Sequence, residues 1–159
     1  MEGMISMSGI LRNALKAVCS IYIPVRSPLK SAKWWQQNFG LEYAVPYNEA
    51  EAQVILKLSD GQWMHLVETE GPIENQFPNK AGYEMFRLTF EVRQIEVLYD
   101  HLKTTDIQIG RLEDRGSCGI NFVFYDLDGN KYDVNECVNV HRTPEEVDKV
   151  KVHLFDQIK

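Results

Sequence analysis

The stretch DGQWMHLVE, residues 60–68, is similar to DGNKYDVNE, residues 128–136 of the same chain. A second pair precedes this one, because IPVR at residues 23–26 is matched by FEVR at residues 90–93. In both pairs the two copies are about 67 residues apart, and a constant separation is typical of an internal repeat. The sequence therefore predicts two similar modules in tandem.

Each module is predicted to contain one strand, one helix and three further strands, from its hydrophobic period and turn residues. Ser27 and Pro28 are typical of a helix start, and Gly40 of a helix end. The first module should have a strand over residues 18–25, a helix to about residue 39, and strands near residues 41–45, 53–58 and 62–68. The second should have a strand over residues 85–92, a helix over residues 94–103, and strands near residues 107–112, 120–125 and 131–136. We therefore expect an α+β fold with two βαβββ modules.

A single domain over residues 1–159 is expected, with modules at about residues 18–68 and 85–136. Residues 69–82 have little periodicity and read as a linker. TPEE at residues 143–146 is a capping-box pattern that predicts a C-terminal helix over about residues 144–158. Its apolar stripe should cover either the domain's own sheet or a partner subunit. The residues of that stripe are Val147, Val150, Leu154 and Ile158.

Composition narrows the class of protein. With 44% hydrophobic and 25% charged residues, the chain is in the range of folded soluble proteins. It has neither an apolar run of membrane-spanning length nor a signal-peptide pattern, so a cytoplasmic protein without membrane contact is expected. Three cysteines without CxxC spacing predict reduced thiols. A net charge of -6 disfavours nucleic acid as a partner.

Two stretches carry a resemblance to a known family. The first is IYIPV at residues 21–25, which runs into AKWW at residues 32–35 and FGLE at residues 39–42. The second is FVFYDLDGN at residues 122–130. On these residues the chain resembles the vicinal-oxygen-chelate superfamily, the glyoxalase, bleomycin-resistance and extradiol-dioxygenase group, from about Val18 to Glu136. It departs from the family pattern at Leu127, where proline is usual, and at Phe39, where leucine is usual.

The resemblance implies two modules whose sheets form a curved mixed sheet around a shared cleft, often completed in a homodimer, and a small-molecule ligand. Metal-dependent members place up to four ligands in that cleft, one from the first and one from the fourth strand of each module. These ligands are His, Gln or Glu, which hold a divalent cation while leaving positions open to two substrate oxygens.

Strand alternation predicts which side chains face the cleft, because successive residues point to opposite sides of a sheet. The cleft-facing residues expected to bind substrate are Ser20, Tyr22, Trp63, His65, Arg87, Thr89 and Asp133. On the family's pattern the four ligand positions fall at Ser20, His65, Arg87 and Asp133. Neutral serine is a poor ligand and arginine is a permanent cation, so no metal cofactor is predicted. If a divalent metal binds, His65 and Asp133 are its expected ligands.

Several interpretations of these side chains stay open. Arg87 could pair with Asp133, or offer its planar fork to a substrate carboxylate or phosphate, and His65 with Asp133 could form a residual metal site. His65 is the best candidate for a catalytic base, and its alternative role is a hydrogen bond to Asp133 or to a hydroxyl. Tyr22 and Trp63 could form an aromatic wall for a flat or cationic ligand, or fill space.

The sequence therefore predicts a small-molecule-binding protein of the glyoxalase and bleomycin-resistance type that does not use the family's usual metal. The alternative is a lyase, isomerase or dioxygenase-like enzyme acting on a small anionic substrate, with His65 and Asp133 as residual metal ligands or His65 as base. A third hypothesis is a vestigial cleft in a protein that acts through its surface.

Overall fold

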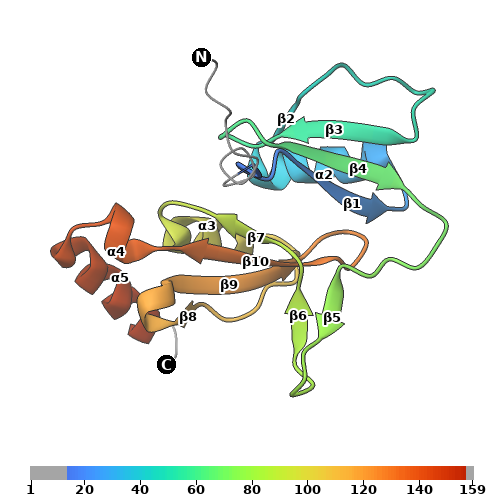
Figure 1. The fold of residues 1–159 in the computed structure, drawn as a ribbon. Helices are drawn as coiled ribbons and strands as arrows, with labels where there is room; N and C mark the ends of the chain where they lie inside the picture. Colours follow the sequence, from blue (N-terminus) through green and yellow to red (C-terminus); the bar gives the residue numbers. More distant parts are fainter. Residues whose placement is uncertain (1–13, 157–159) are drawn as a thin grey trace, which may run out of the picture.

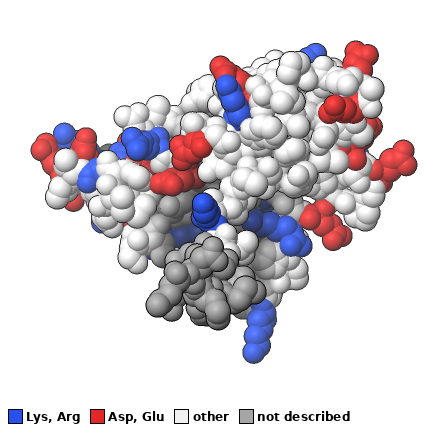
Figure 2. All heavy atoms as spheres, turned by 45° about the horizontal axis from the view of Figure 1, so that its top comes forward, with Lys and Arg blue, Asp and Glu red and all other residues white. Residues whose placement is uncertain are grey.

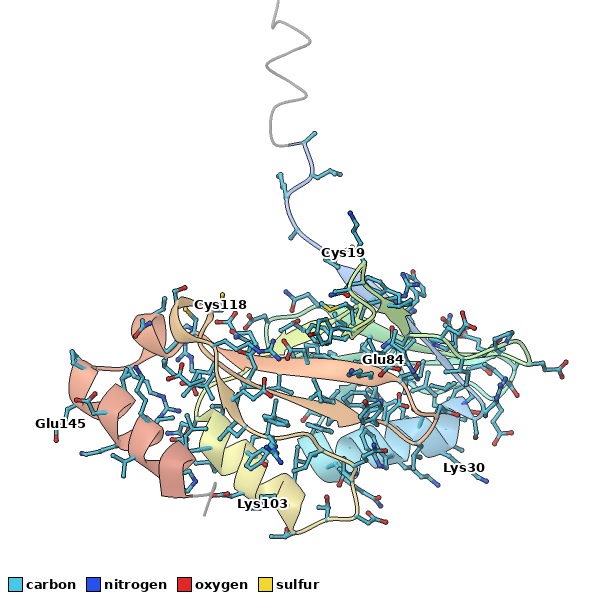
Figure 3. The ribbon with its side chains drawn as sticks, turned by 90° about the horizontal axis from the view of Figure 1, so that it is seen from below. Cys19, Lys30, Glu84, Lys103, Cys118 and Glu145 are labelled. Atoms are coloured by element: carbon cyan, nitrogen blue, oxygen red, sulfur yellow. The ribbon has the colours of Figure 1, made fainter. Side chains whose placement is uncertain are left out.

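The computed structural model describes residues 14–156 of the chain. It contains two four-stranded sheets and a two-stranded hairpin (Figure 1). Figures 1 and 3 show that α2 (Pro28–Phe39), α3 (Ile95–Lys103) and α5 (Pro144–Asp156) lie on one side of the two sheets. The opposite side of each sheet is left uncovered by these helices. This is the α+β fold with unclosed, curved sheets that the sequence predicts.

The first module consists of β1, α2 and three more strands. Its strands are β1 (Ser20–Val25), β2 (Glu42–Tyr43), β3 (Gln53–Lys57) and β4 (Trp63–Glu68), in the order β1-β4-β3-β2. Pro28 is in the first turn of α2, and Gly40 ends the helix with φ +67° and an N–H that bonds the Gln36 carbonyl at 3.0 Å. Glycine adopts this left-handed conformation without the steric cost that a side chain adds. The helix boundaries predicted from Pro28 and Gly40 are confirmed.

The second module repeats this arrangement. Its strands are β7 (Thr89–Glu91), β8 (Glu113–Asp114), β9 (Ile120–Tyr125) and β10 (Lys131–Glu136), in the order β7-β10-β9-β8. In each module the first strand is parallel to the last, so Tyr22 lies level with His65, and Thr89 lies level with Asp133. The internal repeat in the sequence is therefore a repeat of sheet topology. A short 3-10 turn, Gly116–Cys118, precedes β9.

Two expected strands are wrong in their extent. The strand expected over residues 85–92 is broken into β6 (Glu84–Phe86) and β7, because β6 leaves the second sheet to pair with β5 (Gln76–Pro78). The strand expected over residues 107–112 is reduced to an isolated bridge between Ile109 and Phe124, and regular pairing begins only at β8. Gly110 lies so close to Val123 that a Cβ there would meet its side chain at 2.7 Å.

The two modules are held together by aromatic packing and by the DLDGN turn. Trp35 of α2 is 1% exposed, and its ring centroid lies 5.4–5.8 Å from those of Phe90, Phe124 and Tyr132 in the second module. Asn130 also donates from Nδ2 to the Pro24 carbonyl of β1 at 3.0 Å. The stretch that carries the family resemblance therefore joins the modules.

The DLDGN turn is ordered by Asp126. Its Oδ1 accepts the backbone N–H groups of Asp128 and Asn130 at 2.9 and 3.0 Å, and its Oδ2 accepts the Tyr132 hydroxyl at 2.9 Å. Burial raises the pKa of Asp126, and the hydrogen bonds from Asn130 and Tyr132 partly offset the rise. Asp128 in turn accepts the backbone N–H of Arg26 at 3.0 Å, a second link to the first module.

The C-terminal helix α5 packs against its own chain. Val147, Val150 and Leu154 are buried and belong to the hydrophobic core, whereas Ile158 lies outside the described residues. A short helix, α4 (Val138–His141), leads into α5. Of the two alternatives for the apolar stripe, the structure shows cover of the domain's own sheet. Within residues 14–156, no helix has the length and apolarity needed to cross a bilayer.

Candidate functional site

Aromatic side chains gather on the uncovered face of the first sheet. The rings of Tyr22 and His65 are stacked with centroids 4.4 Å apart and planes 22° from parallel, and Trp63 lies 6.2 Å from His65. Tyr22 is 69% exposed and Trp63 is 42% exposed, although both are large aromatic side chains. We call Tyr22, Trp63 and His65 the ring platform. Strand alternation correctly predicted that these three side chains share one face.

The imidazole of His65 is held by a residue that the sequence did not single out. Its Nδ1 lies 3.2 Å from Oε1 of Gln53 in β3, so the Nδ1–H tautomer donates to Gln53 and leaves Nε2 without that proton. The expected partner, Asp133 or a hydroxyl, was wrong. Burial lowers the pKa of His65, which favours the neutral ring. Gln53 could have been found by alternation, which places it on the face of β3 opposite to the apolar pair Val54 and Leu56.

The second sheet presents a buried carboxylate on its uncovered face. Asp133 is 2% exposed, and its Oδ2 accepts hydrogen bonds from Thr89 Oγ1 and Asn121 Nδ2, both at 3.1 Å. Its Oδ1 is buried and has no hydrogen-bond partner among the described residues; Arg115 Nη1 lies 3.8 Å away. Burial raises the pKa of Asp133, and Thr89, Arg115 and Asn121 offset only part of the rise.

Asn121 is itself fixed by a neighbour. Asn135 donates from Nδ2 to Asn121 Oδ1 at 3.1 Å and to the Cys118 carbonyl at 2.7 Å. Figure 3 labels Cys118 on the uncovered side of the sheets, opposite Lys30 and Lys103 on the helical side. The carboxylate, two amides and one hydroxyl therefore form a connected polar network on the second sheet.

Arg87 does not lie where alternation placed it. It falls between β6 and β7, is exposed, and has its guanidinium 5.3 Å above the ring centre of Phe77 in β5. The expected ion pair with Asp133 is wrong, because the chain turns toward the β5–β6 hairpin at this point and Arg115 approaches Asp133 instead. Arg115 had no spacing signal in the sequence, since the loop after β8 brings it there.

Ser20, the remaining predicted position, begins β1 level with Trp63. The described residues thus form two separate clusters: the ring platform on the first sheet, and the network of Thr89, Asn121 and Asp133 on the second. Tyr22 of the platform lies on β1 and Thr89 of the network lies on β7, and each of these strands is an edge strand of its sheet.

The four family ligand positions do not fit a divalent metal. Neither Ser20 nor Arg87 supplies a good donor. Asp133 has one oxygen engaged in two hydrogen bonds and the other turned toward the Arg115 cation. Within residues 14–156, no three His, Cys, Asp or Glu side chains are grouped so that they could hold a metal ion. We therefore assign no chemical step to a metal.

Comparison with known proteins gives a match to one family. The family model described as Glyoxalase/Bleomycin resistance protein/Dioxygenase superfamily matches residues 17–134. A search of curated protein sequences finds no significant match.

Solved structures share the fold at low sequence identity. A putative glyoxalase family protein from Bacillus anthracis is 16% identical, with a TM-score of 0.60, over 77% of this chain and 96% of that one. Lactoylglutathione lyase from Agrobacterium tumefaciens is 16% identical, with a TM-score of 0.58, over 76% and 93%. A mutant of the fosfomycin resistance protein FosX from Listeria monocytogenes, complexed with Mn(II) and 1S,2S-dihydroxypropylphosphonic acid, is 15% identical, with a TM-score of 0.58, over 76% and 90%.

Proposed function

The chain belongs to the Glyoxalase/Bleomycin resistance protein/Dioxygenase superfamily, and from this premise we propose that it is a small-molecule-binding protein that does not use the metal of metal-dependent members. The ring platform carries this proposal. An exposed tyrosine stacked on a histidine, with an exposed tryptophan beside it, adds little to folding and offers a flat surface to a planar ligand. The mismatch at the metal positions supports the second half of the proposal.

Removal of the platform's outer ring tests ligand binding. Tyr22→Ala should weaken the binding of planar aromatic ligands about tenfold, because a ring stack contributes about 0.5–1.5 kcal/mol beyond burial. Tyr83→Ala is the matched control, since Tyr83 is 71% exposed and lies in the turn between β5 and β6, away from the ring platform. The affinity is measured from quenching of tryptophan fluorescence, to which the exposed Trp63 contributes. Equal affinities of wild type and Tyr22→Ala for every ligand that binds would contradict the platform's role.

Metal content tests the other half of the proposal. Protein purified without a metal column should contain well under one tightly bound divalent ion per chain. One ion per chain that survives dialysis, and that is lost in Asp133→Asn, would overturn the metal-free proposal.

A second candidate function is catalysis with His65 as a general base. Its support is that burial lowers the pKa of His65, so the ring is neutral at pH 7 and Nε2 can accept a proton. The substrate would be a small anion, bound by Arg87 or Arg115. If this candidate is right, His65→Gln abolishes turnover, while Tyr22→Ala changes mainly the KM.

We also propose that the protein forms a homodimer. Edge strands with unpaired backbone groups tend to acquire a partner, and both β1 and β7 are such edges. Sedimentation velocity should give a dimer at micromolar concentration. A monomer at every concentration up to the solubility limit would contradict this proposal.

A further inference from the structure

A cavity opens between the two modules, at the edges of β1 and β7 that face each other in Figure 1. Its volume is about 910 Å³. Its floor is apolar and reaches the hydrophobic core through Trp35 and Phe39 of α2, Leu98 of α3 and Phe124 of β9. The cavity therefore extends from the sheet edges into the helical side of the molecule.

This cavity is separate from the ring platform. Successive side chains of β1 point to opposite faces of the sheet, so Ile21 lines the cavity while Tyr22 points away to the platform. Thr89 of the second-sheet network lines the cavity, but neither His65 nor Asp133 does. A ligand in the cavity would therefore be recognised by different side chains from those of the proposed function.

Water finds few hydrogen-bond partners on the apolar floor of this cavity. A buried water needs two to four polar partners, and the floor of this cavity supplies aromatic and aliphatic carbon. The volume lies in the range of about 300–1,000 Å³ that ligand pockets of drug-sized molecules occupy. An apolar molecule would gain about 25 cal/mol for each Å² of its surface removed from water.

The charged residues at the rim of the cavity discriminate between ligands by the sign of their charge. The charged residues that line the cavity are Glu42, Lys57, Asp60 and Glu91. Lys57 is paired with Glu42 at 3.0 Å, and Glu91 contacts Nε2 of His141 at 2.6 Å. Asp60 has no ion-pair partner among the described residues, so its carboxylate adds negative charge at the rim. The whole chain also has a net charge of -6. On the face shown in Figure 2, Lys and Arg are interspersed with acidic side chains. An anion would meet repulsion at the cavity entrance.

We propose that this inter-module cavity is a second binding site, for a largely apolar small molecule that is uncharged or cationic. The apolar part lies on the floor formed by Trp35, Phe39 and Phe124. The carboxylate of Asp60 at the rim and the net charge of -6 disfavour anions of the same shape.

Two fluorescent probes that share one ring skeleton test both parts of the proposal. N-phenyl-1-naphthylamine is uncharged, and 1-anilinonaphthalene-8-sulfonate has the same rings with an added sulfonate. The uncharged probe should bind saturably at one high-affinity site per chain, and the sulfonate should bind that site at least tenfold more weakly, at low ionic strength. Asp60→Lys should narrow that ratio by about threefold, because it replaces a rim carboxylate with a cation. Equal or tighter binding of the sulfonate would overturn the charge selection.

A cavity-filling substitution tests the location. Leu98→Trp projects a large ring into the cavity and should weaken binding of the uncharged probe at least tenfold. Val97→Trp is the matched control, because Val97 is the preceding residue of α3 and is 59% exposed. If Leu98→Trp lowers the thermal midpoint strongly, Leu41→Trp fills the cavity from the other module. Equal probe binding in the cavity and control variants would place the probe elsewhere and overturn the proposal.

Two further readouts distinguish a ligand in the cavity from a ligand on the ring platform and from a partner subunit. Tyr22→Ala should leave the affinity of the cavity site for the uncharged probe unchanged. Any second, weaker binding of the probe that Tyr22→Ala removes belongs to the ring platform, so failure of the platform and failure of the cavity are distinguishable. Probe binding is also measured while the protein concentration is raised through dimer formation. Loss of binding in the dimer would assign the cavity to a second copy of the chain and overturn the small-molecule proposal.

Discussion

Substitution of Glu136 by alanine should be among the most damaging single changes outside the aromatic core. Glu136 ends β10 and is 1% exposed. Its Oε1 accepts Nε of Arg142 at 2.7 Å, and its Oε2 accepts Nη2 of Arg142 at 2.6 Å and the backbone N–H of Ile95 at 2.8 Å. The Glu136 carboxylate thus caps the N-terminus of α3, where the N-cap residue Gln94 makes no side-chain hydrogen bond. It also holds Arg142, which lies between α4 and α5.

The expected loss of stability depends on the hydrogen bonds that Arg142 keeps in Glu136→Ala. Removing one partner of a buried ion pair costs about 3–5 kcal/mol, because the other charge is left buried without compensation. Here Arg142 keeps two bonds to Glu96, at 2.7 and 2.5 Å, so the lower end applies. We expect a loss of about 3 kcal/mol in the free energy of unfolding. For a chain of 159 residues this corresponds to a fall in Tm of about 6–12 °C.

The assay is equilibrium unfolding in guanidinium chloride, followed by circular dichroism and by tryptophan fluorescence. Glu145→Ala is the control, because Glu145 forms only an exposed pair with Lys149 at 3.2 Å. Such surface pairs contribute about 0–1 kcal/mol. A loss below about 1 kcal/mol for Glu136→Ala, or a loss equal to that of the control, would refute the energetic account of this network.

The same variant has a predictable pH dependence. Burial alone would raise the pKa of Glu136, but hydrogen bonds from Arg142 and the Ile95 N–H outweigh burial and lower it. A carboxyl group with a lowered pKa in the folded state stabilises the fold above its unfolded pKa, and that stabilisation is lost as pH falls through the folded pKa. The difference between wild type and Glu136→Ala should therefore be largest near pH 7 and shrink below about pH 4. An unchanged difference at acid pH would contradict this account.

Two further predictions concern the backbone and the ring platform. Gly119→Ala should destabilise the fold by about 3–5 kcal/mol, since its Cβ would lie 2.2 Å from the Glu136 carbonyl oxygen and its φ is +94°. Gly61→Ala is the control and should cost about 1 kcal/mol, because Gly61 has φ +90° but open space around its Cβ position. Equal losses of unfolding free energy in the two variants would contradict the steric account. Because the pKa of His65 is lowered, protonation opposes folding, so wild-type stability should fall as pH drops below about 6.5. His65→Gln should flatten that part of the profile of unfolding free energy against pH, and an identical slope in the variant would show that His65 is not responsible.

The sequence was informative where local chemistry decides the structure. Pro28 and Gly40 delimit α2 because proline at the first turn and a left-handed glycine act within a few residues. Alternation placed Tyr22, Trp63 and His65 on one face because the period of a strand is two residues. These features need no knowledge of distant contacts.

The sequence failed where a distant contact decides the structure. Apolar alternation continues across residues 85–92, yet β6 pairs with β5 and carries Arg87 away from the second sheet. Arg115 reaches Asp133 only because the chain returns through Gly116 and Gly119, both at positive φ. Neither pairing leaves a regular spacing in the sequence, so the wrong arginine was assigned to the carboxylate.

His65 and Asp133 occupy the same position in the two modules, and burial shifts the pKa of each residue. Burial lowers the pKa of His65 and raises that of Asp133, so each group is shifted toward its uncharged form. A divalent metal needs neutral imidazole but an ionised carboxylate, and a proton on Asp133 competes with the cation. Burial therefore favours the neutral imidazole of His65, which can bind a metal or accept a proton. The same burial disfavours the ionised carboxylate of Asp133, which makes it a weaker metal ligand than an exposed aspartate. If the protein binds no metal, as we propose, the burial of Asp133 in the second module contributes to the poor fit as much as the presence of Ser20 and Arg87 at the other ligand positions does.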